Sequence, residues 1–458
     1  MQEGISTRYC LAITKRRPTK KLNNARIRSI IAVAVIAMAA STPVCASGSH
    51  RQAPPAQVSS YTQKDAQTDE SAWRSLLPAV SGIPVFELDY AESKVYTLDA
   101  KEKETLIASG WDYKGPVFYS CDAEGAIPVY RLHDPWLHFI YSLSDSVPGY
   151  TLDGPAFLVQ NAATTWQTVT LDADKTSTFH VHNGQSVIIN LNGHNITPES
   201  GPAVLIDKEG TVIINSNGNL TAAGSDPVVR NNGCAVLNGG HYENNGNYCI
   251  INHGNMIING GEYTHSDRDC VSSLIATGYY NYYSWNSGIG YVAGVNMSSP
   301  MLTINGGDFH GGRWLLKSDD NGRGFINGGN FYDAKYSVIK NWSTLELIGG
   351  TYTARENGEA YGLITNGHVQ SDGTREDVDP GTLDIYGGTY NPGAFVFYPA
   401  NNGDGRSLVY GNITVYKMDV TGNAALTNET WPIVSDCDFN QIIGTGNIER
   451  IMQGISEN

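Results

Sequence analysis

The chain has 458 residues, including 50 Gly and 26 Tyr, and carries a formal net charge of −15. This acidic balance argues against nucleic acid and anionic membranes as partners, because both repel a negatively charged protein. The many Gly and Tyr residues, together with abundant Asn, favour a turn-rich all-β chain over a helical one.

Residues 1–46 have the features of an export signal. Eight Lys and Arg residues lie between Arg8 and Arg28, and the apolar run Ile30–Ala40 follows them. This run is too short to span a bilayer comfortably, and Val44-Cys45-Ala46 resembles a cleavage site with small residues. We therefore expect a signal peptide, no membrane span, and a secreted or extracellular protein that associates with a cell surface.

Residues 47–80 are predicted to form a disordered linker, because the segment is rich in Ser, Gln, Ala and Pro. Residues 81–159 contain a repeat instead. The segments 83–86 (IPVF), 95–98 (VYTL) and 110–118 return as 127–130 (IPVY), 140–143 (IYSL) and 149–157. Residues 100–108 (AKEKETLIA) have helical periodicity and occur only in the first copy, so a small two-copy α+β/β module is predicted.

This module resembles a secreted bacterial repeat of unknown function that has the pattern VYRLYNP, HFYT, a short Glu-rich helix, GW and AFY. The matching residues are 128–135 (PVYRLHDP), His138-Phe139 and Gly110-Trp111. The shortened second copy departs from the pattern. Repeats of this kind occur beside cell-wall-lytic and surface domains, so the resemblance implies an accessory that binds the cell wall or a glycan.

Residues 160–420 repeat a Gly-Gly-x-aromatic phrase. Its aromatic residues recur at nearly equal intervals, with longer gaps before the third and the sixth, and are Tyr242, Tyr263, Phe309, Phe331, Tyr352 and Tyr390. Short alternating apolar strands precede most Gly-Gly pairs, and a tight corner suits Asn, which tolerates the left-handed backbone region, and Gly, which enters it freely. A period near 21 predicts a right-handed parallel β-helix whose equivalent aromatics stack, with residues 421–458 as a C-terminal cap or tail.

A β-sandwich or a propeller is the alternative fold, although a propeller blade needs about 40 residues per repeat. The opening segment 178–197 (TFHVHNGQSVIINLNGHNIT) and the later Ile-Asn-Gly-Gly-x-Phe coils resemble bacterial secreted β-helix surface proteins of the pectin-lyase-like fold. This resemblance implies the fold more than it implies any activity.

Two cysteines, Cys249 and Cys270, are separated by 21 residues, which is the period of one predicted coil. They are expected to stack in neighbouring coils within reach of a disulfide, and the pattern leaves open whether they are bonded or free. No CxxC or His/Cys cluster occurs, so no metal site and no cofactor are predicted. Calcium binding stays open without support, and oligomeric state is not predicted.

The doubled gap between Tyr263 and Phe309 predicts an inserted loop rich in aromatic residues. Flat sugar faces stack on such rings, and neighbouring polar groups bond to hydroxyls. The candidate ligand-binding residues are Tyr279, Tyr280, Tyr282, Tyr283 and Trp285, extended by Arg313, Trp314 and Trp342. The alternative is that these rings pack onto the solenoid body or meet another subunit.

A charged constellation is predicted along one corner of the stack. Arg230, Asn252, Lys317 and Lys340 follow comparable apolar strands, so Lys317 and Lys340 are expected to be close neighbours. With Asp319 and Asp320 they resemble the groove of β-helix polysaccharide lyases, or of inverting hydrolases with carboxylates about 6.5–9.5 Å apart. The alternative is a ladder of opposite charges in solvent.

The favoured interpretation is a non-catalytic β-helix scaffold that binds a polysaccharide or cell-surface glycan, or mediates adhesion. A polysaccharide lyase or glycoside hydrolase that uses Lys317, Asp319, Asp320 and Lys340 is the alternative. A spacer with a purely structural role is a third possibility.

Overall fold

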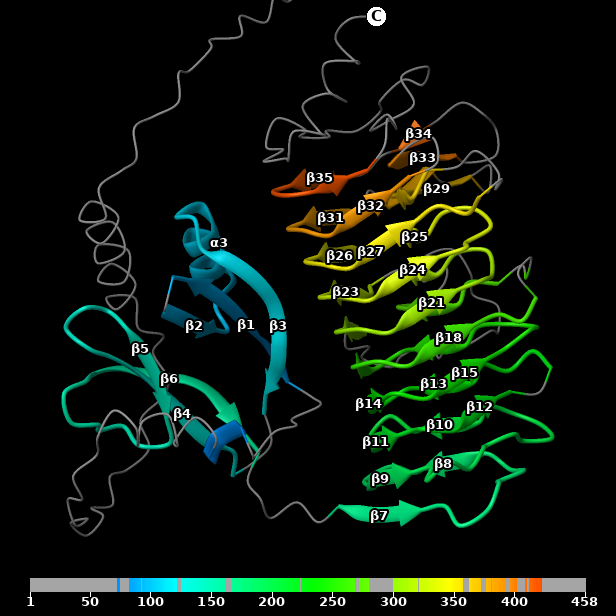
Figure 1. Cartoon of the computed structure of the whole chain (residues 1–458), viewed down its shortest axis with the longest axis horizontal. Helices are drawn as coiled ribbons and strands as arrows, with labels where there is room; N and C mark the ends of the chain where they lie inside the picture. The colour runs from blue at the N-terminus through cyan, green and yellow to red at the C-terminus, as the bar shows by residue number, and fades with distance from the viewer. Residues whose placement is uncertain are drawn as a thin grey trace, which may run out of the picture.

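The computed structural model describes residues 72–74, 82–91, 93–121, 125–160, 166–222, 224–267, 270, 272–279, 300–319, 321–356, 362–371, 376–379, 381–392, 396–401, 408–409 and 412–421. The expected signal peptide and all of the expected C-terminal segment except Thr421 lie outside these residues. The main body is a parallel β-solenoid whose coils stack in one direction (Figure 1). The predicted all-β class and the parallel solenoid are therefore confirmed.

Three parallel sheets, called faces 1, 2 and 3, form the walls of the solenoid. Face 1 contains β8 (Phe179–Val181), β10 (Val204–Ile206), β13 (Val229–Asn231), β16 (Ile250–Asn252), β19 (Ile275–Thr277), β22 (Leu316–Ser318), β25 (Ile339–Asn341), β28 (Ile364–Asn366) and β33 (Phe397–Asn401), with β34 (Leu408–Val409) antiparallel to β33. Face 2 contains β7 (Gln167–Thr170), β9 (Ser186–Asn190), β11 (Thr211–Asn215), β14 (Cys234–Asn238), β17 (Asn255–Ile258), β20 (Met301–Ile304), β23 (Arg323–Ile326), β26 (Thr344–Leu347), β31 (Thr382–Ile385) and β35 (Asn412–Val415). Face 3 contains β12 (Asn219–Thr221), β15 (His241–Glu243), β18 (Glu262–Thr264), β21 (Asp308–His310), β24 (Asn330–Tyr332), β27 (Thr351–Thr353), β32 (Thr389–Asn391) and β36 (Asp419–Val420).

The predicted aromatic stack lies inside face 3. Tyr242 pairs with Tyr263 in register, and their ring centroids are 4.6 Å apart with an interplanar angle of 8°. The same spacing continues through Phe309, Phe331, Tyr352 and Tyr390, with centroids between 4.6 and 5.2 Å apart. One sequence period therefore makes one coil, as predicted, and each coil adds one buried ring to a continuous core.

The two longer gaps are single coils with insertions. Tyr263 pairs directly with Phe309 across the first of them, and residues 280–299 of this insertion lie outside the described part. Tyr352 likewise pairs with Tyr390, and the antiparallel hairpin of β29 (His368–Ser371) and β30 (Glu376–Asp379) fills that gap. The predicted insertion between Tyr263 and Phe309 is thus confirmed.

The Asn-Gly-Gly corners place glycine in the left-handed backbone region. The second glycine is the left-handed residue, as at Gly329, where φ is +110° and an added Cβ would lie 3.2 Å from the Gly307 carbonyl oxygen. The asparagines before the Gly-Gly pairs, Asn238, Asn259, Asn305 and Asn327, do not have positive φ, so glycine alone takes the left-handed conformation at these corners. The corner asparagines form an external amide ladder, in which each Nδ2 donates to the Oδ1 of the preceding coil over 2.7–2.9 Å, through Asn190, Asn215, Asn238, Asn259, Asn305 and Asn327.

A second amide ladder lies inside the solenoid, at the end of the face 1 strands. Asn231 donates to Asn252 over 2.8 Å, and Asn252 donates to Thr277 over 3.0 Å. The register pairs Asn252 with Asn231, whereas Arg230 pairs with Ile251. The prediction that Arg230 and Asn252 share a position was wrong by one residue, and such a shift moves a side chain from one side of a sheet to the other.

The repeat module forms two three-stranded antiparallel sheets of the same order. The first copy contains β1 (Ile83–Tyr90), β2 (Ser93–Thr97), α3 (Ala100–Ala108) and β3 (Asp112–Ser120), and the second contains β4 (Ile127–His133), β5 (Phe139–Ser142) and β6 (Thr151–Val159). The first strand of each copy is central, so the predicted repeat corresponds to a repeated topology. Asp99 caps α3, because its carboxylate accepts the Lys101 amide hydrogen bond over 2.8 Å.

The described part of the predicted linker belongs to this module. Residues 72–74 are helical, and the Trp73 ring is buried against Tyr96, Phe118 and Phe157. The Trp73 indole also donates to the Tyr141 carbonyl over 3.1 Å. The prediction of a disordered linker up to residue 80 is therefore wrong at Trp73, because one large buried ring outweighs the polar composition around it.

The module packs against the outer side of face 2, beside β14, β23 and β26 (Figure 1). Phe325 of β23 contacts Phe86 of β1, with ring centroids 6.2 Å apart, and the Asn327 amide donates to the Pro116 carbonyl over 2.9 Å. Val236 and Ile257, which point outward from face 2, are buried with Tyr119 of β3. The sequence signal for this contact is the continuous apolar run in β17, which is typical of a strand covered on both sides.

The two cysteines predicted to stack do not occupy equivalent positions. Cys249 lies beside Leu274 of the next coil, because Ile250 pairs with Ile275. Cys249 and Cys270 both carry free thiols, and burial raises the pKa of each thiol. Equal sequence spacing was misleading, because this coil is lengthened by residues before β19. No helix within the described residues is long and apolar enough to cross a membrane.

Candidate functional site

Lys317 and Lys340 lie side by side on face 1. Lys317 is the central residue of β22, Lys340 is the central residue of β25, and the two pair directly in register. Their neighbours Leu316 and Ile339 point into the core and are fully buried. Strand alternation therefore places both ammonium groups on the outer side of the solenoid, and the predicted proximity of Lys317 and Lys340 is confirmed.

Two tryptophans interleave with the two lysines. Lys340 Nζ lies 4.0 Å from the ring centroid of Trp314 and 4.8 Å from that of Trp342. Lys317 Nζ lies 4.0 Å from the Trp342 centroid. These distances are within the range of cation–π attraction, which contributes about 0.5–2 kcal/mol per pair according to desolvation. The rings thereby offset the repulsion between two stacked ammonium groups.

Arg313 and Tyr336 continue the cluster. The Arg313 guanidinium carbon lies 4.5 Å from the Trp314 centroid and 4.9 Å from the Tyr336 centroid. Tyr336 was missed in the sequence, although it follows Arg313 by one coil and its amide donates to the Arg313 carbonyl. Trp314, Arg313, Tyr336 and Lys340 are partly exposed, so these four residues form the accessible part of the site. This set is called the Trp–Lys patch.

A buried carboxylate lies beneath the Trp–Lys patch. Asp319 forms an ion pair with Lys317, with Oδ1 2.5 Å from Nζ, and both side chains are less than 5% exposed. Burial raises the pKa of Asp319, and the charge of Lys317 opposes that rise. Burial also lowers the pKa of Lys340 to about 7, and the positive charge of Lys317 adds to this effect. Lys340 is thus a lysine whose charge changes near neutral pH.

The remaining predicted residues divide into two groups. Tyr279 is partly buried, its hydroxyl donates to the His253 carbonyl over 3.1 Å, and its ring stacks on His253 with centroids 4.8 Å apart. This is the alternative in which the ring packs on the solenoid body. The residues outside the described part are Tyr280, Tyr282, Tyr283, Trp285 and Asp320.

The patch provides two kinds of chemistry. Aromatic faces beside partly exposed cations suit a ligand with both apolar ring faces and negative charge. A lysine with a pKa near 7 is also partly neutral at neutral pH, and a neutral amine can accept a proton. The two lysines have different environments. Lys317 is buried and paired with Asp319, whereas Lys340 is partly exposed and lies over Trp314.

One family model matches part of the chain. Residues 53–162 match a domain of unknown function, DUF5648. The matched range contains the whole repeat module and also Trp73, in agreement with the packing of Trp73 in the module core. No curated protein and no solved structure matches the chain.

Proposed function

We propose that the chain is an exported protein that binds an acidic polysaccharide through the Trp–Lys patch of face 1. The observation that carries this proposal is the position of Lys340 over Trp314, with Arg313 on the same ring system. A carboxylate or sulfate of the polymer meets Arg313 and Lys340, which lie over the Trp314 ring, while the sugar ring contacts the exposed atoms of Trp314 and Tyr336. Arg313 supplies a planar group that bonds to a carboxylate in two places.

The geometry of a solenoid supports a polymeric ligand. Strands of face 1 are stacked coil upon coil, so a linear chain that lies along the stack meets equivalent positions at regular intervals. The outward positions change along the stack from Arg230 through Ile251 and Ala276 to Lys317 and Lys340. The positive charge at Lys317 and Lys340 is therefore confined to two neighbouring coils of face 1, so it contacts a few sugar units of a bound polymer.

Binding is tested by titration of the full chain with acidic and neutral polysaccharides, for example polygalacturonate, alginate and dextran. We expect acidic polymers to bind, and Trp314→Ala and Lys340→Met each to weaken binding about tenfold or more, which corresponds to about 1.4 kcal/mol. Lys175→Met is the matched control, because Lys175 also lies over an aromatic ring, 6.0 Å from the Phe179 centroid. Equal binding by Lys340→Met and the original chain would disprove the proposal and favour a structural role for the patch.

A polysaccharide lyase is the second candidate, favoured by the lowered pKa of Lys340. In β-elimination a base removes the proton next to the uronate carboxylate, and the glycosidic oxygen leaves. In this candidate Lys340 acts as that base, and Arg313 neutralises the carboxylate. Formation of an unsaturated uronate, followed by ultraviolet absorbance, separates the two candidates. A chain that binds acidic polymer without forming this product is a binding protein, and product formed equally by Lys340→Met rules out Lys340 as the base.

A further inference from the structure

Two histidines and one aspartate converge at the amino-terminal end of face 1, away from the Trp–Lys patch. His180 lies in β8 and His182 follows at its end, and Val181 between them is fully buried in the core. Alternation along the strand therefore turns both imidazoles to the outer side. The pattern His-x-His at 180–182 was visible in the sequence, but its third partner was not.

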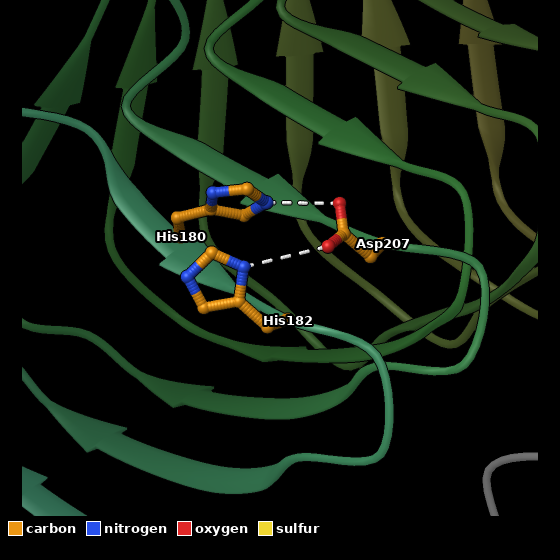
Figure 2. A group of neighbouring side chains, drawn as sticks. All are labelled: His180, His182 and Asp207. Carbon is orange, nitrogen blue, oxygen red and sulfur yellow. Dashed lines mark hydrogen bonds and ion pairs between the residues drawn. The ribbon is translucent and has the colours of Figure 1, made fainter.

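Asp207 is brought to this histidine pair by the parallel register of β8 and β10. Leu205 pairs with His180 and Ile206 pairs with Val181, so Asp207 is next in line beside His182. His180 Nε2 lies 2.8 Å from Asp207 Oδ1, and His182 Nδ1 lies 3.5 Å from Asp207 Oδ2 (Figure 2). The two imidazole centroids are 3.9 Å apart. Each carboxylate oxygen thus faces one imidazole nitrogen.

Backbone hydrogen bonds hold the two corners that carry these side chains. The Asp207 amide donates to the Val181 carbonyl over 2.9 Å, and the Gly184 amide donates to the Glu209 carbonyl over 3.1 Å. The His182 amide donates to Gln185 Oε1 over 2.8 Å. The ligand atoms are therefore positioned by the solenoid itself, which reduces the ordering cost of binding.

We propose that His180, His182 and Asp207 bind a divalent transition-metal ion such as Zn²⁺ or Cu²⁺. One nitrogen from each imidazole and one carboxylate oxygen lie within 4.8 Å of one another. Bonds of 2.0–2.1 Å in a tetrahedral site place ligand atoms about 3.3 Å apart. Small side-chain rotations are therefore sufficient to bring the three ligand atoms around one ion. Imidazole and carboxylate ligands suit zinc and copper, and three protein ligands leave a position for water or an external ligand.

A second group of two histidines and one carboxylate lies elsewhere on the solenoid, but its three ligand atoms do not come close together. Glu262 lies between His241 and His310 on face 3, with carboxylate-to-imidazole distances of 3.0 and 3.1 Å. Among the described residues, only His180, His182 and Asp207 form a group of three or more such side chains whose ligand atoms all lie within 4.8 Å. The Glu262 group has the same chemistry without the geometry, so it provides an internal control.

Metal binding here would stabilise the pairing of β8, the first described strand of face 1, with β10. β8 is an edge strand with β10 as its neighbour in the sheet, and the ion would join the ends of both strands. A ligand that binds only the folded state stabilises it by mass action. The ion is therefore expected to raise the thermal stability of the chain as well as to occupy the site.

The test uses the full chain without a histidine tag and Zn²⁺ as the probe, by calorimetric titration and thermal unfolding. We expect about one equivalent of Zn²⁺ to bind at micromolar concentration and to raise the melting temperature, and a chelator to reverse the rise. His182→Ala and Asp207→Asn are expected to lose both effects, whereas Glu262→Gln keeps them. Circular dichroism without metal confirms that the variants are folded, which is expected because all three substitutions lie at the surface.

Three outcomes would overturn the proposal. They are no binding below about 1 mM Zn²⁺, unchanged binding in both His182→Ala and Asp207→Asn, and loss of binding in Glu262→Gln alone. Electron paramagnetic resonance with Cu²⁺ adds a direct readout of the ligands. Two imidazole nitrogens coordinated to Cu²⁺ are expected in the original chain and no such site-specific signal in His182→Ala, and two coordinated nitrogens in both chains would also overturn the proposal.

Discussion

Lys103 of the repeat module and Glu346 of the solenoid are 243 residues apart in the chain, yet Lys103 Nζ lies 3.2 Å from Glu346 Oε2. Their side chains are only 6% and 4% exposed. The Tyr113 hydroxyl donates to the same oxygen over 2.8 Å, and Arg323 lies 3.4 Å from the other. Because both charges are buried and paired, this contact makes the attachment of the module to face 2 specific.

The first prediction concerns this buried ion pair. Glu346→Ala leaves the Lys103 ammonium buried without its main partner, so we expect a loss of about 3–5 kcal/mol in unfolding free energy. Urea unfolding followed by circular dichroism measures the effect. The matched control is Asp112→Ala, which removes the partner of Lys114 in an exposed ion pair of 2.6 Å and is expected to cost at most about 1 kcal/mol. Equal losses in the two variants would contradict this prediction.

The second prediction compares two hydroxyl groups in the aromatic stack. The Tyr352 hydroxyl donates to the Gly349 carbonyl over 2.8 Å, so Tyr352→Phe is expected to cost about 1 kcal/mol. Within the described residues the buried Tyr242 hydroxyl has no hydrogen-bond partner, so Tyr242→Phe is expected to be neutral or stabilising. Chemical denaturation of both variants measures the difference, and a larger loss for Tyr242→Phe would be inconsistent with the stack as described.

The third prediction is a pH dependence that arises from Lys340. Its pKa is about 7 in the folded protein, and that of a lysine in an unfolded chain is about 10.4. Between these values the unfolded chain binds more protons, so the contribution of Lys340 to stability rises with pH. The unfolding free energy of the original chain minus that of Lys340→Met should therefore rise from about pH 6 to about pH 9, because only the original chain gains stability from this titration. A difference that stays constant over this range would show that Lys340 titrates normally.

The same titration predicts the pH dependence of ligand binding. Lys340 loses its charge as the pH rises through about 7, so the affinity for an acidic polysaccharide should fall over that range. Lys340→Arg keeps its charge at all these pH values and should bind with little pH dependence. Calorimetric titration at several pH values makes the comparison, and an identical pH profile for both chains would assign the dependence to another group.

The last prediction compares the interior and exterior amide ladders. Asn252 accepts from Asn231 over 2.8 Å and donates to Thr277 and to the Met301 carbonyl, each over 3.0 Å. Asn252→Leu leaves these buried groups without their partner and is expected to cost about 3 kcal/mol. Asn259→Leu, in the exposed ladder, should cost less than about 1 kcal/mol, because water replaces the lost partner. Urea midpoints of the two variants test whether burial makes the difference.

The sequence by itself determined the period, the strand-and-corner coil and the repeated module, because these follow from local patterns. Gly-Gly-x-aromatic phrases one period apart predict Phe331 above Tyr352, and the structure places their ring centroids 5.2 Å apart. The proximity of Lys317 and Lys340 follows from the same period. Each of these relations needs only the strand alternation and the coil length, both of which are visible along the chain.

Only the tertiary structure decided which residues meet across insertions, faces and modules. A coil lengthened before β19 placed Leu274, and not Cys270, beside Cys249, and a shift of one residue separated Asn252 from Arg230. Glu346 looks like any outward residue of a strand until the module covers it. Asp207 joins His180 and His182 only through the register of two short strands. The physical reason is shared, because each of these contacts depends on distances between segments that local sequence patterns do not specify.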